Sequence, residues 1–169
     1  MLKPRIRTDL EATAGLEARD VVELTERATQ ATFFTDGLTA EQVDANSRIP
    51  PLAGQVFFEA AASEAQHLAA AFAGDRLIGF MIATRHGPED LELDWLMVDP
   101  EYHGTRLAGS LIEAGIEWLG SSRAIWLTVI KHNARAISFY RRFGFEIDTA
   151  AELKRVVPTW IMRRPPRLG

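Results

Sequence analysis

The residues best suited to chemistry lie where a predicted strand runs into a predicted helix, in residues 91–119. The strand ends at Val98, Asp99 and Pro100 form a turn, and an amphipathic helix is predicted over residues 104–119. The first backbone N–H groups of a helix have no partner within the helix, and its dipole places partial positive charge there. The segment therefore predicts a site for an anion such as a pyrophosphate.

The side chains at this helix start are compatible with a bound ligand. Gly104, Ala108 and Gly109 are small enough to let a ligand approach the backbone, and Arg106 either contacts a phosphate or points into solvent. Equally, glycines in an ordinary strand–helix connection can serve packing alone, and the spacing does not decide between the two interpretations. The segment is neither a Walker A loop nor a dinucleotide-binding fingerprint, because Gly-Lys-Ser/Thr and G-x-G-x-x-G are both absent.

Composition narrows the function classes. The 169 residues are 47% hydrophobic and 25% charged, which predicts one globular domain over residues 1–169. A net charge of −4 gives no general attraction to nucleic acid or anionic membranes, so neither is an expected partner. No cysteine is present and the four histidines lack ligand spacing, so no metal site is expected. The charged first ten residues and the lack of a long apolar run favour a cytoplasmic location.

The predicted elements give a mixed α/β fold. Strands are expected at residues 5–8, 67–73, 76–84, 91–98, 124–130, 145–149 and 156–163, and Gly74 and Asp75 indicate a hairpin turn between the second and the third. Helices are expected at residues 16–34, after a capping box at Thr39 and Gln42, and at 52–65, 104–119 and 134–143. Pro50 and Pro51 are expected to break the chain locally. The crossover through the long helix favours a parallel pair of strands in the sheet.

Two stretches resemble the GNAT N-acetyltransferase superfamily. Residues 98–111, V-D-P-E-Y-H-G-T-R-L-A-G-S-L, resemble its acetyl-CoA-binding motif, roughly V-x-P-x-Y-[QR]-x-x-G-x-[GA]-x-x-L. Residues 133–145, N-A-R-A-I-S-F-Y-R-R-F-G-F, resemble its N-x-x-A-x-x-F-Y-x-x-x-G-F signature. The resemblance covers residues 68–163 as the acetyl-CoA-binding core and leaves residues 1–67 as a variable acceptor side. It implies a mixed, mostly antiparallel sheet that is splayed at its centre and flanked by helices.

The resemblance also implies which residues bind acetyl-CoA, as a cosubstrate. Backbone N–H groups at the helix start would hold the pyrophosphate, and the strand end would hydrogen-bond the pantetheine arm. Asn133 resembles an asparagine that contacts this arm, although a plain N-cap is the other interpretation. His103 departs from the family's usual Gln or Arg, and Arg106 from its first motif glycine. The implied cofactor-binding residues are Leu96, Met97, Val98, His103, Gly104, Thr105, Arg106, Leu107, Ala108, Gly109, Asn133 and Tyr140.

Three residues are candidates for proton transfer. Glu92 and Asp94 alternate along one strand and so share a face, where either could remove the proton from a lysine-like amine of pKa about 10. The other interpretation is that both lie on a solvated strand face. Tyr140 resembles the tyrosine that protonates the departing CoA thiolate in this family, and its alternative role is as a core residue beside Phe139 and Phe143.

The predicted function is therefore N-acetyl transfer from acetyl-CoA to a small-molecule or peptide amine, by direct attack in a ternary complex. The lack of a cysteine nucleophile is consistent with direct attack. The alternative is a CoA-binding regulatory module without turnover. The resemblance is also compatible with a homodimer, whereas nothing in the sequence identifies the acceptor.

Overall fold

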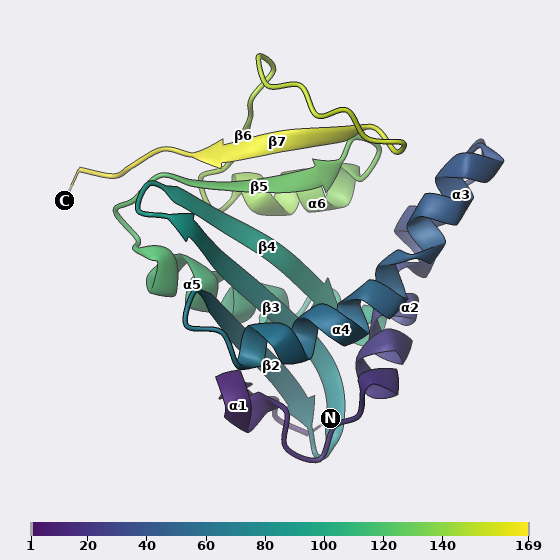
Figure 1. The fold of residues 1–169 in the computed structure, drawn as a ribbon, viewed down its shortest axis with the longest axis vertical. Helices are drawn as coiled ribbons and strands as arrows, with labels where there is room; N and C mark the ends of the chain where they lie inside the picture. Colours follow the sequence, from purple (N-terminus) through teal and green to yellow (C-terminus); the bar gives the residue numbers. More distant parts are fainter. Residues whose placement is uncertain (1, 169) are drawn as a thin grey trace.

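Seven strands form one open sheet in the computed structural model, which describes residues 2–168 (Figure 1). Their order is β1-β2-β3-β4-β5-β7-β6, and every neighbouring pair is antiparallel except β4 and β5, which are parallel. The sheet confirms the predicted mixed, mostly antiparallel architecture and the parallel step. The strands are β1 (Arg5–Thr8), β2 (Gln66–Ala73), β3 (Arg76–Gly87), β4 (Asp90–Val98), β5 (Ile125–Ile130), β6 (Glu146–Ile147) and β7 (Thr159–Arg164).

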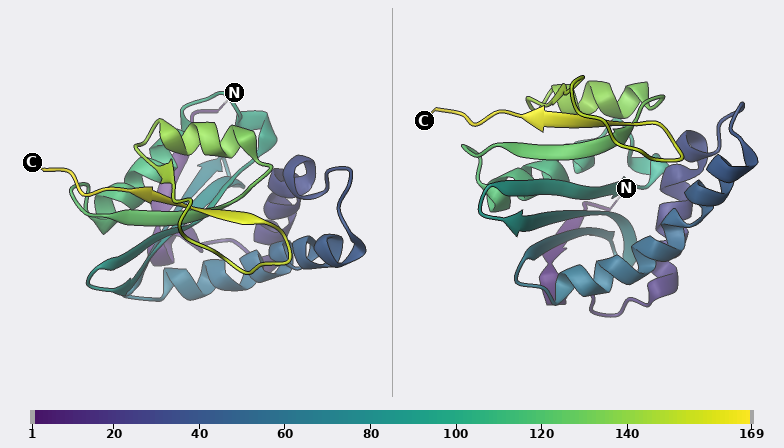
Figure 2. Two further views of the ribbon diagram at one scale, coloured as in Figure 1. Left: turned by 90° about the horizontal axis from the view of Figure 1, so that it is seen from above. Right: turned by 45° about the horizontal axis from the view of Figure 1, so that its top comes forward.

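Helices cover both faces of this sheet (Figure 2). Alternation along β2 explains why two cores exist, because Ala69 and Ala71 enter one and Leu68 and Phe72 enter the other. The first core contains residues of α5 and α6, and the second contains residues of α1, α2 and α4. The helices are α1 (Asp9–Ala12), α2 (Ala18–Phe33), α3 (Ala40–Ser47), α4 (Ile49–Ala61), α5 (Leu107–Leu119) and α6 (Ala134–Arg141), with a 3-10 turn at Pro100–Tyr102.

Local sequence signals account for several of these boundaries. The predicted capping box is confirmed at α3, where the Gln42 N–H donates to Thr39 Oγ1 at 3.1 Å and the Thr39 N–H donates to Gln42 Oε1 at 3.0 Å. The predicted β2–β3 hairpin is also confirmed, and Gly74 in its turn has a φ of +62°, a conformation that glycine adopts without steric cost.

Two predictions about helix starts are wrong. Helix α4 begins at Ile49 rather than at Leu52, so the break expected at Pro50 and Pro51 falls just before them, between α3 and α4. The two prolines lie in the first turn of α4, where a missing N–H costs nothing because it would have no helical partner. Helix α5 begins at Leu107 rather than at Gly104. Gly104 has a φ of +77°, and Thr105 Oγ1 donates to the Tyr102 carbonyl at 2.6 Å, so these residues form a turn before the helix.

Strands β4 and β5 diverge, which opens the sheet at its centre. Their one recorded register pair among the described residues is Glu92 with Trp126. Beyond that point β4 remains paired with β3 as far as Val98, whereas β5 remains paired with β7 as far as Ile130. The edge of β4 that faces β5 is consequently left without ladder partners over its last residues.

Candidate active site

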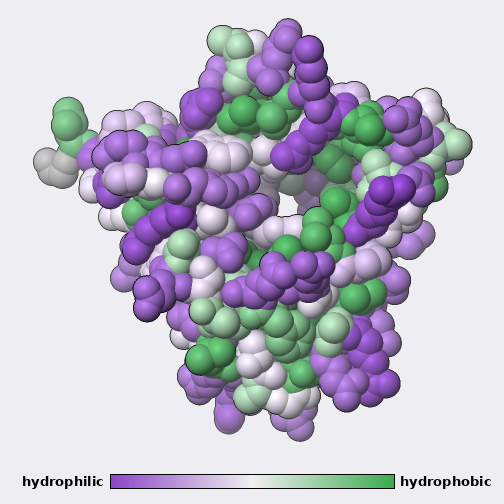
Figure 3. All heavy atoms as spheres, viewed as in Figure 1, coloured by the Kyte–Doolittle hydropathy of each residue, from purple (hydrophilic) through white to green (hydrophobic). Residues whose placement is uncertain are grey.

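A cavity of about 660 Å³ occupies the gap between β4 and β5. Residues of α2, α3, α4, α6 and the segment before β7 complete its walls. Figure 3 shows a hollow near the middle of the molecule, bordered by both polar and apolar atoms. Six of the residues predicted from the sequence line this one cavity: Glu92, Asp94, Leu96, Met97, Asn133 and Tyr140.

Glu92 lies on the cavity wall with its side chain 10% exposed, and its Oε2 is 2.6 Å from Nε2 of His86. Burial raises the pKa of Glu92, and the neighbouring charge of Asp94 raises it further, whereas His86 opposes both effects. Glu92 is therefore a stronger base than an ordinary glutamate when it is ionised, and it has a proton-carrying neighbour of its own.

Asp94 lies beside Glu92 but has a different partner. The hydroxyl of Thr84 donates to Asp94 Oδ2 at 3.1 Å, and Gln66 Nε2 donates to the same hydroxyl oxygen at 3.1 Å. Burial raises the pKa of Asp94, while the Thr84 hydrogen bond and the charges of His86 and Arg155 lower it. The two carboxylates thus share a cavity, yet only Glu92 contacts a second titratable group.

Tyr140 and Asn133 reach the cavity from α6 and from the residue just before it. Burial raises the pKa of Tyr140 to about 12, so its phenol stays protonated at neutral pH. No hydrogen bond within residues 2–168 uses the Tyr140 hydroxyl. Asn133 caps α6, because its Oδ1 accepts the Ala136 N–H at 3.1 Å. This cap engages the amide oxygen of Asn133 and leaves its NH₂ group available in the cavity.

The predicted pyrophosphate loop lies at the end of β4, outside the cavity lining. Three of its N–H groups already have partners: His103 donates to the Pro100 carbonyl, Thr105 to the Tyr102 carbonyl, and Leu107 to Thr105 Oγ1. Within the described chain, four N–H groups of the loop and the first turn of α5 have no hydrogen-bond acceptor: those of Gly104, Arg106, Ala108 and Gly109.

The residues that depart from the family motif are both exposed. Desolvation and the charge of Arg135 lower the pKa of His103, which disfavours the charged form of its imidazole. Arg106 has helical backbone angles at the N-cap of α5 and forms no ion pair within residues 2–168. Of the two side chains, Arg106 is therefore the one that brings a positive charge to the loop.

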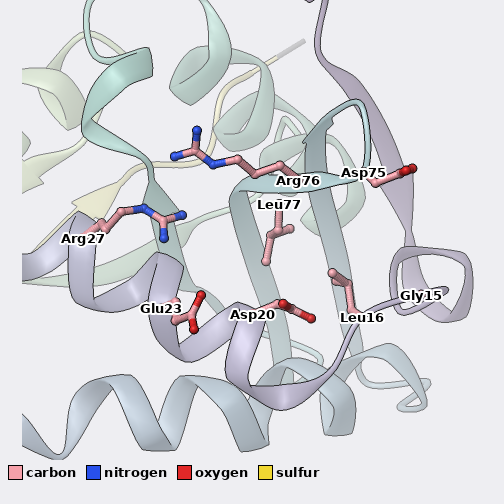
Figure 4. A pocket seen from close by; sticks show the side chains of 8 residues that line it. All are labelled: Gly15, Leu16, Asp20, Glu23, Arg27, Asp75, Arg76 and Leu77. Atoms are coloured by element: carbon pink, nitrogen blue, oxygen red, sulfur yellow. The ribbon is translucent and has the colours of Figure 1, made fainter.

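Asp99, the first residue after β4, fixes the start of this loop through hydrogen bonds of its buried carboxylate. Its side chain is 1% exposed, and it accepts hydrogen bonds from Arg27 Nε at 3.0 Å, Arg76 Nη2 at 2.8 Å and the Glu101 N–H at 3.1 Å. Figure 4 shows Arg27 and Arg76 beside a small polar pocket of about 250 Å³. None of the predicted site residues lines that second pocket.

Sequence reasoning missed His86, Arg155 and Asp99. The sequence places Asp99 in a turn and holds no signal for its arginine partners. His86 lies two residues after Thr84, which pairs with Glu92 across the β3–β4 hairpin. Alternation from that pair would have placed the imidazole on the face of the carboxylates.

No helix of residues 2–168 combines the length and the apolar composition needed to cross a lipid bilayer.

Comparisons with known proteins address the family directly. An uncharacterized N-acetyltransferase of Mycobacterium tuberculosis is 36% identical over 77 residues, which are 43% of this chain and about half (48%) of that relative. The PaiA N-acetyltransferase of Thermoplasma acidophilum, solved in complex with coenzyme A, has a TM-score of 0.73 at 18% identity, over 97% of this chain and 99% of that one. An acetyltransferase of Streptococcus agalactiae has a TM-score of 0.69 at 18% identity, over 96% and 98%. These two structures share the fold. The model of the acetyltransferase (GNAT) family matches residues 28–145, and the chain belongs to that family.

Proposed function

We propose that the protein is an N-acetyltransferase that moves an acetyl group from acetyl-CoA to an amine by direct attack. The observation that carries this proposal is that one cavity holds a buried carboxylate, Glu92, and a protonated phenol, Tyr140. Direct transfer requires a base for the amine and an acid for the leaving thiolate on either side of one thioester. The cavity lies where β4 and β5 separate, between residues of the variable acceptor side and the acetyl-CoA-binding core.

Free donors of the protein fit the parts of acetyl-CoA. The four unpaired N–H groups of Gly104, Arg106, Ala108 and Gly109, at the positive end of α5, suit the pyrophosphate. A side chain added at Gly104 would meet no atom within 4 Å, so the loop has open space in front of it. The unpaired edge of β4 at Leu96, Met97 and Val98, together with the Asn133 amide, suits the pantetheine arm.

The proposed proton steps balance. Glu92 takes one proton from the acceptor ammonium, and the neutral amine then attacks the thioester carbonyl carbon. The C–S bond breaks, Tyr140 donates its phenolic proton to the sulfur, and the second proton of the amine nitrogen returns to Tyr140. Because the pKa of Tyr140 exceeds that of a thiol near 8.5, donation of the phenolic proton to the thiolate is unfavourable by itself, and the return of the amine proton to Tyr140 drives it.

A screen of amines with acetyl-CoA, followed by the release of free thiol, tests the proposal. Thiol release must depend on the amine and on Glu92, so Glu92→Gln should lower kcat about 100-fold or more with an unchanged affinity for CoA. Asp94→Asn is the matched comparison and should cost less, since Asp94 lacks the histidine partner.

The alternative, a regulatory module that binds CoA without turnover, makes a different prediction. CoA would still raise the melting temperature, because a ligand that binds only the folded state stabilises it, but no amine would release thiol. The absence of both thiol release and CoA-dependent stabilisation would reject the enzyme and the module together.

A further inference from the structure

We propose that His86 is the positioning residue of this site: it holds one oxygen of Glu92, leaves the other for the acceptor amine and sets the pH at which Glu92 works as a base. The inference rests on the proposed function, and it assigns a role to a residue that matches no position of either family motif. Its basis is the geometry of the β3–β4 hairpin.

The contact between the two side chains is short and lies at the border of the cavity. Nε2 of His86 is 2.6 Å from Oε2 of Glu92, whose side chain is 10% exposed, whereas that of His86 is 42% exposed. His86 is not among the residues that line the cavity, but Glu92 is. The imidazole therefore lies between the buried carboxylate and solvent, where it can exchange a proton with water.

A neighbouring tryptophan keeps the imidazole in this place. The Trp126 ring stacks on it, with a centroid distance of 6.0 Å and an interplanar angle of 24°. Trp126 is itself fixed, because its Nε1 donates to Asp90 Oδ1 at 2.7 Å and its backbone pairs with Glu92. A histidine packed in this way can direct its Nε2 at the carboxylate, as a positioning residue must.

The charged groups around the pair determine its ionisation. Asp90 and Asp94 from β4 raise the pKa of His86, after the larger effect of the hydrogen bond to Glu92, while partial burial opposes them. Arg155, from the segment before β7, lowers the pKa of Glu92, as His86 does. Loss of His86 therefore leaves burial and the charge of Asp94, which raise the pKa of Glu92, opposed by the smaller effect of Arg155.

The consequence for catalysis has a definite sign. A general base works only when it is deprotonated, so activity falls as the pH drops through the apparent pKa of the pair. When His86 is replaced, the pKa of Glu92 rises and this acidic limb of kcat/KM moves to higher pH. In His86→Gln the new side chain can still donate a hydrogen bond to Glu92 but carries no charge. This variant therefore distinguishes the effect of holding Glu92 in place from the effect of the charge of His86 on the pKa of Glu92.

The test is the pH profile of kcat/KM for the wild type, His86→Gln and His86→Ala, with an amine from the acceptor screen. His86→Ala should lower the plateau about 10-fold and move the acidic limb up by about one pH unit. His86→Gln should keep the plateau within about threefold and move the limb by less. KM for acetyl-CoA should change in neither variant. Identical acidic limbs in all three proteins would overturn the proposal.

His67 provides a matched control within the same chain. Its Nδ1 is 3.2 Å from Asp9 Oδ1, and its ring stacks on Trp118 at 5.5 Å, but it does not line the cavity. The pH profile of His67→Gln should be that of the wild type. A shift as large as that of His86→Gln would show a general effect of losing a stacked histidine, and it would overturn the specific role.

An NMR titration of the histidine imidazoles separates this proposal from the proposed function. In Glu92→Gln the pKa of His86 should fall, because its largest raising interaction is removed. An unchanged His86 pKa would overturn the pairing even in an active enzyme. If the His86 pKa falls in a protein that acetylates no amine, the hydrogen bond between His86 and Glu92 is supported. That result would nevertheless reject both the proposed acetyl transfer and the role of His86 in catalysis.

Discussion

Arg27 and Asp99 are 72 positions apart in the chain, yet the Nε of Arg27 lies 3.0 Å from Oδ2 of Asp99. Arg27 belongs to α2, residues of which line the cavity, and Asp99 begins the loop proposed to bind pyrophosphate. Arg76, at the start of β3, donates to the same carboxylate oxygen. Helix α2, strand β3 and the start of this loop are thus joined at one buried carboxylate.

Asp99→Asn should lower the free energy of unfolding by about 2 kcal/mol at pH 7, because charge-assisted hydrogen bonds are stronger than neutral ones. Urea denaturation measures the change. Asp44→Asn is the control, since Asp44 pairs with Arg48 while 62% exposed and should contribute below about 0.5 kcal/mol. Equal effects of the two substitutions would contradict the anchoring role of Asp99.

The pH dependence of stability gives Asp99 and Asp94 opposite signs. Burial tends to raise the pKa of Asp99, but the Glu101 N–H and the two guanidinium groups outweigh it and hold that pKa below its ordinary value. A lowered folded pKa gives stability that is present above the unfolded pKa and is lost as the pH falls toward the folded pKa. The destabilisation of Asp99→Asn should therefore shrink below about pH 4, the unfolded pKa of aspartate.

Asp94→Asn should instead stabilise the protein at pH 8. The pKa of Asp94 is raised by burial, so ionisation costs stability as the pH rises through its folded pKa. The asparagine amide oxygen can still accept the Thr84 hydroxyl and carries no charge to desolvate. Urea midpoints at pH 4 and pH 8 measure this, with the gain expected at the higher pH. A loss of stability at pH 8 would contradict this prediction, because it would mean that the ionised Asp94 carboxylate stabilises the folded protein.

The features predicted correctly from the sequence are those that depend on local patterns. The Thr39–Gln42 capping box, the Gly74 turn and the crossover through α5 each follow from residues close together in the chain. Of the six predicted residues that line one cavity, Asn133 and Tyr140 belong to the second motif, and the other four lie on the strand that leads into the first motif.

The features that the sequence does not predict depend on competing local interactions or on contacts between residues far apart in the chain. Helix α5 begins at Leu107 and not at the predicted Gly104, because the positive φ of Gly104 and the hydrogen bond of the Thr105 hydroxyl stabilise a separate turn. The Arg27–Asp99 pair joins segments with no pattern in common, so only the folded chain brings them together. His86 lies at an irregularity in the β3–β4 register, so alternation from the Thr84–Glu92 pair gives the face of its imidazole but not its contact with Glu92.

Tyr140→Phe tests the proposed acid. The phenol should remain protonated at neutral pH because its pKa is about 12, so its loss removes a proton donor without changing the charge of the cavity. We expect kcat to fall about 100-fold, as for the loss of a positioned general acid, with CoA affinity within about twofold of the wild type. Thiol release and calorimetric CoA binding measure the two quantities. Tyr102→Phe, at the other tyrosine of the chain, should leave both unchanged, and full activity in Tyr140→Phe would exclude the acid role.

Gly104→Ala tests the proposed pyrophosphate loop. Gly104 has a φ of +77°, so alanine should cost about 1–2 kcal/mol of stability through backbone strain. It should also weaken CoA binding about 10-fold, because relief of that strain turns the free N–H groups of Gly104 and Arg106 away from their present directions. Urea denaturation and calorimetry measure the two effects.

Gly15 makes this test specific, because its backbone is matched to that of Gly104. Its φ is also +77°, and an added Cβ would meet no atom within 4 Å at either glycine. The strain of Gly15→Ala and Gly104→Ala should therefore be nearly equal, whereas Gly15 lies between α1 and α2 and is not part of the loop. Equal losses of stability with a loss of CoA affinity in Gly104→Ala alone would support the loop as the binding site. Equal CoA affinities in the two variants would place the pyrophosphate elsewhere, since strain alone would then account for everything that Gly104→Ala changes.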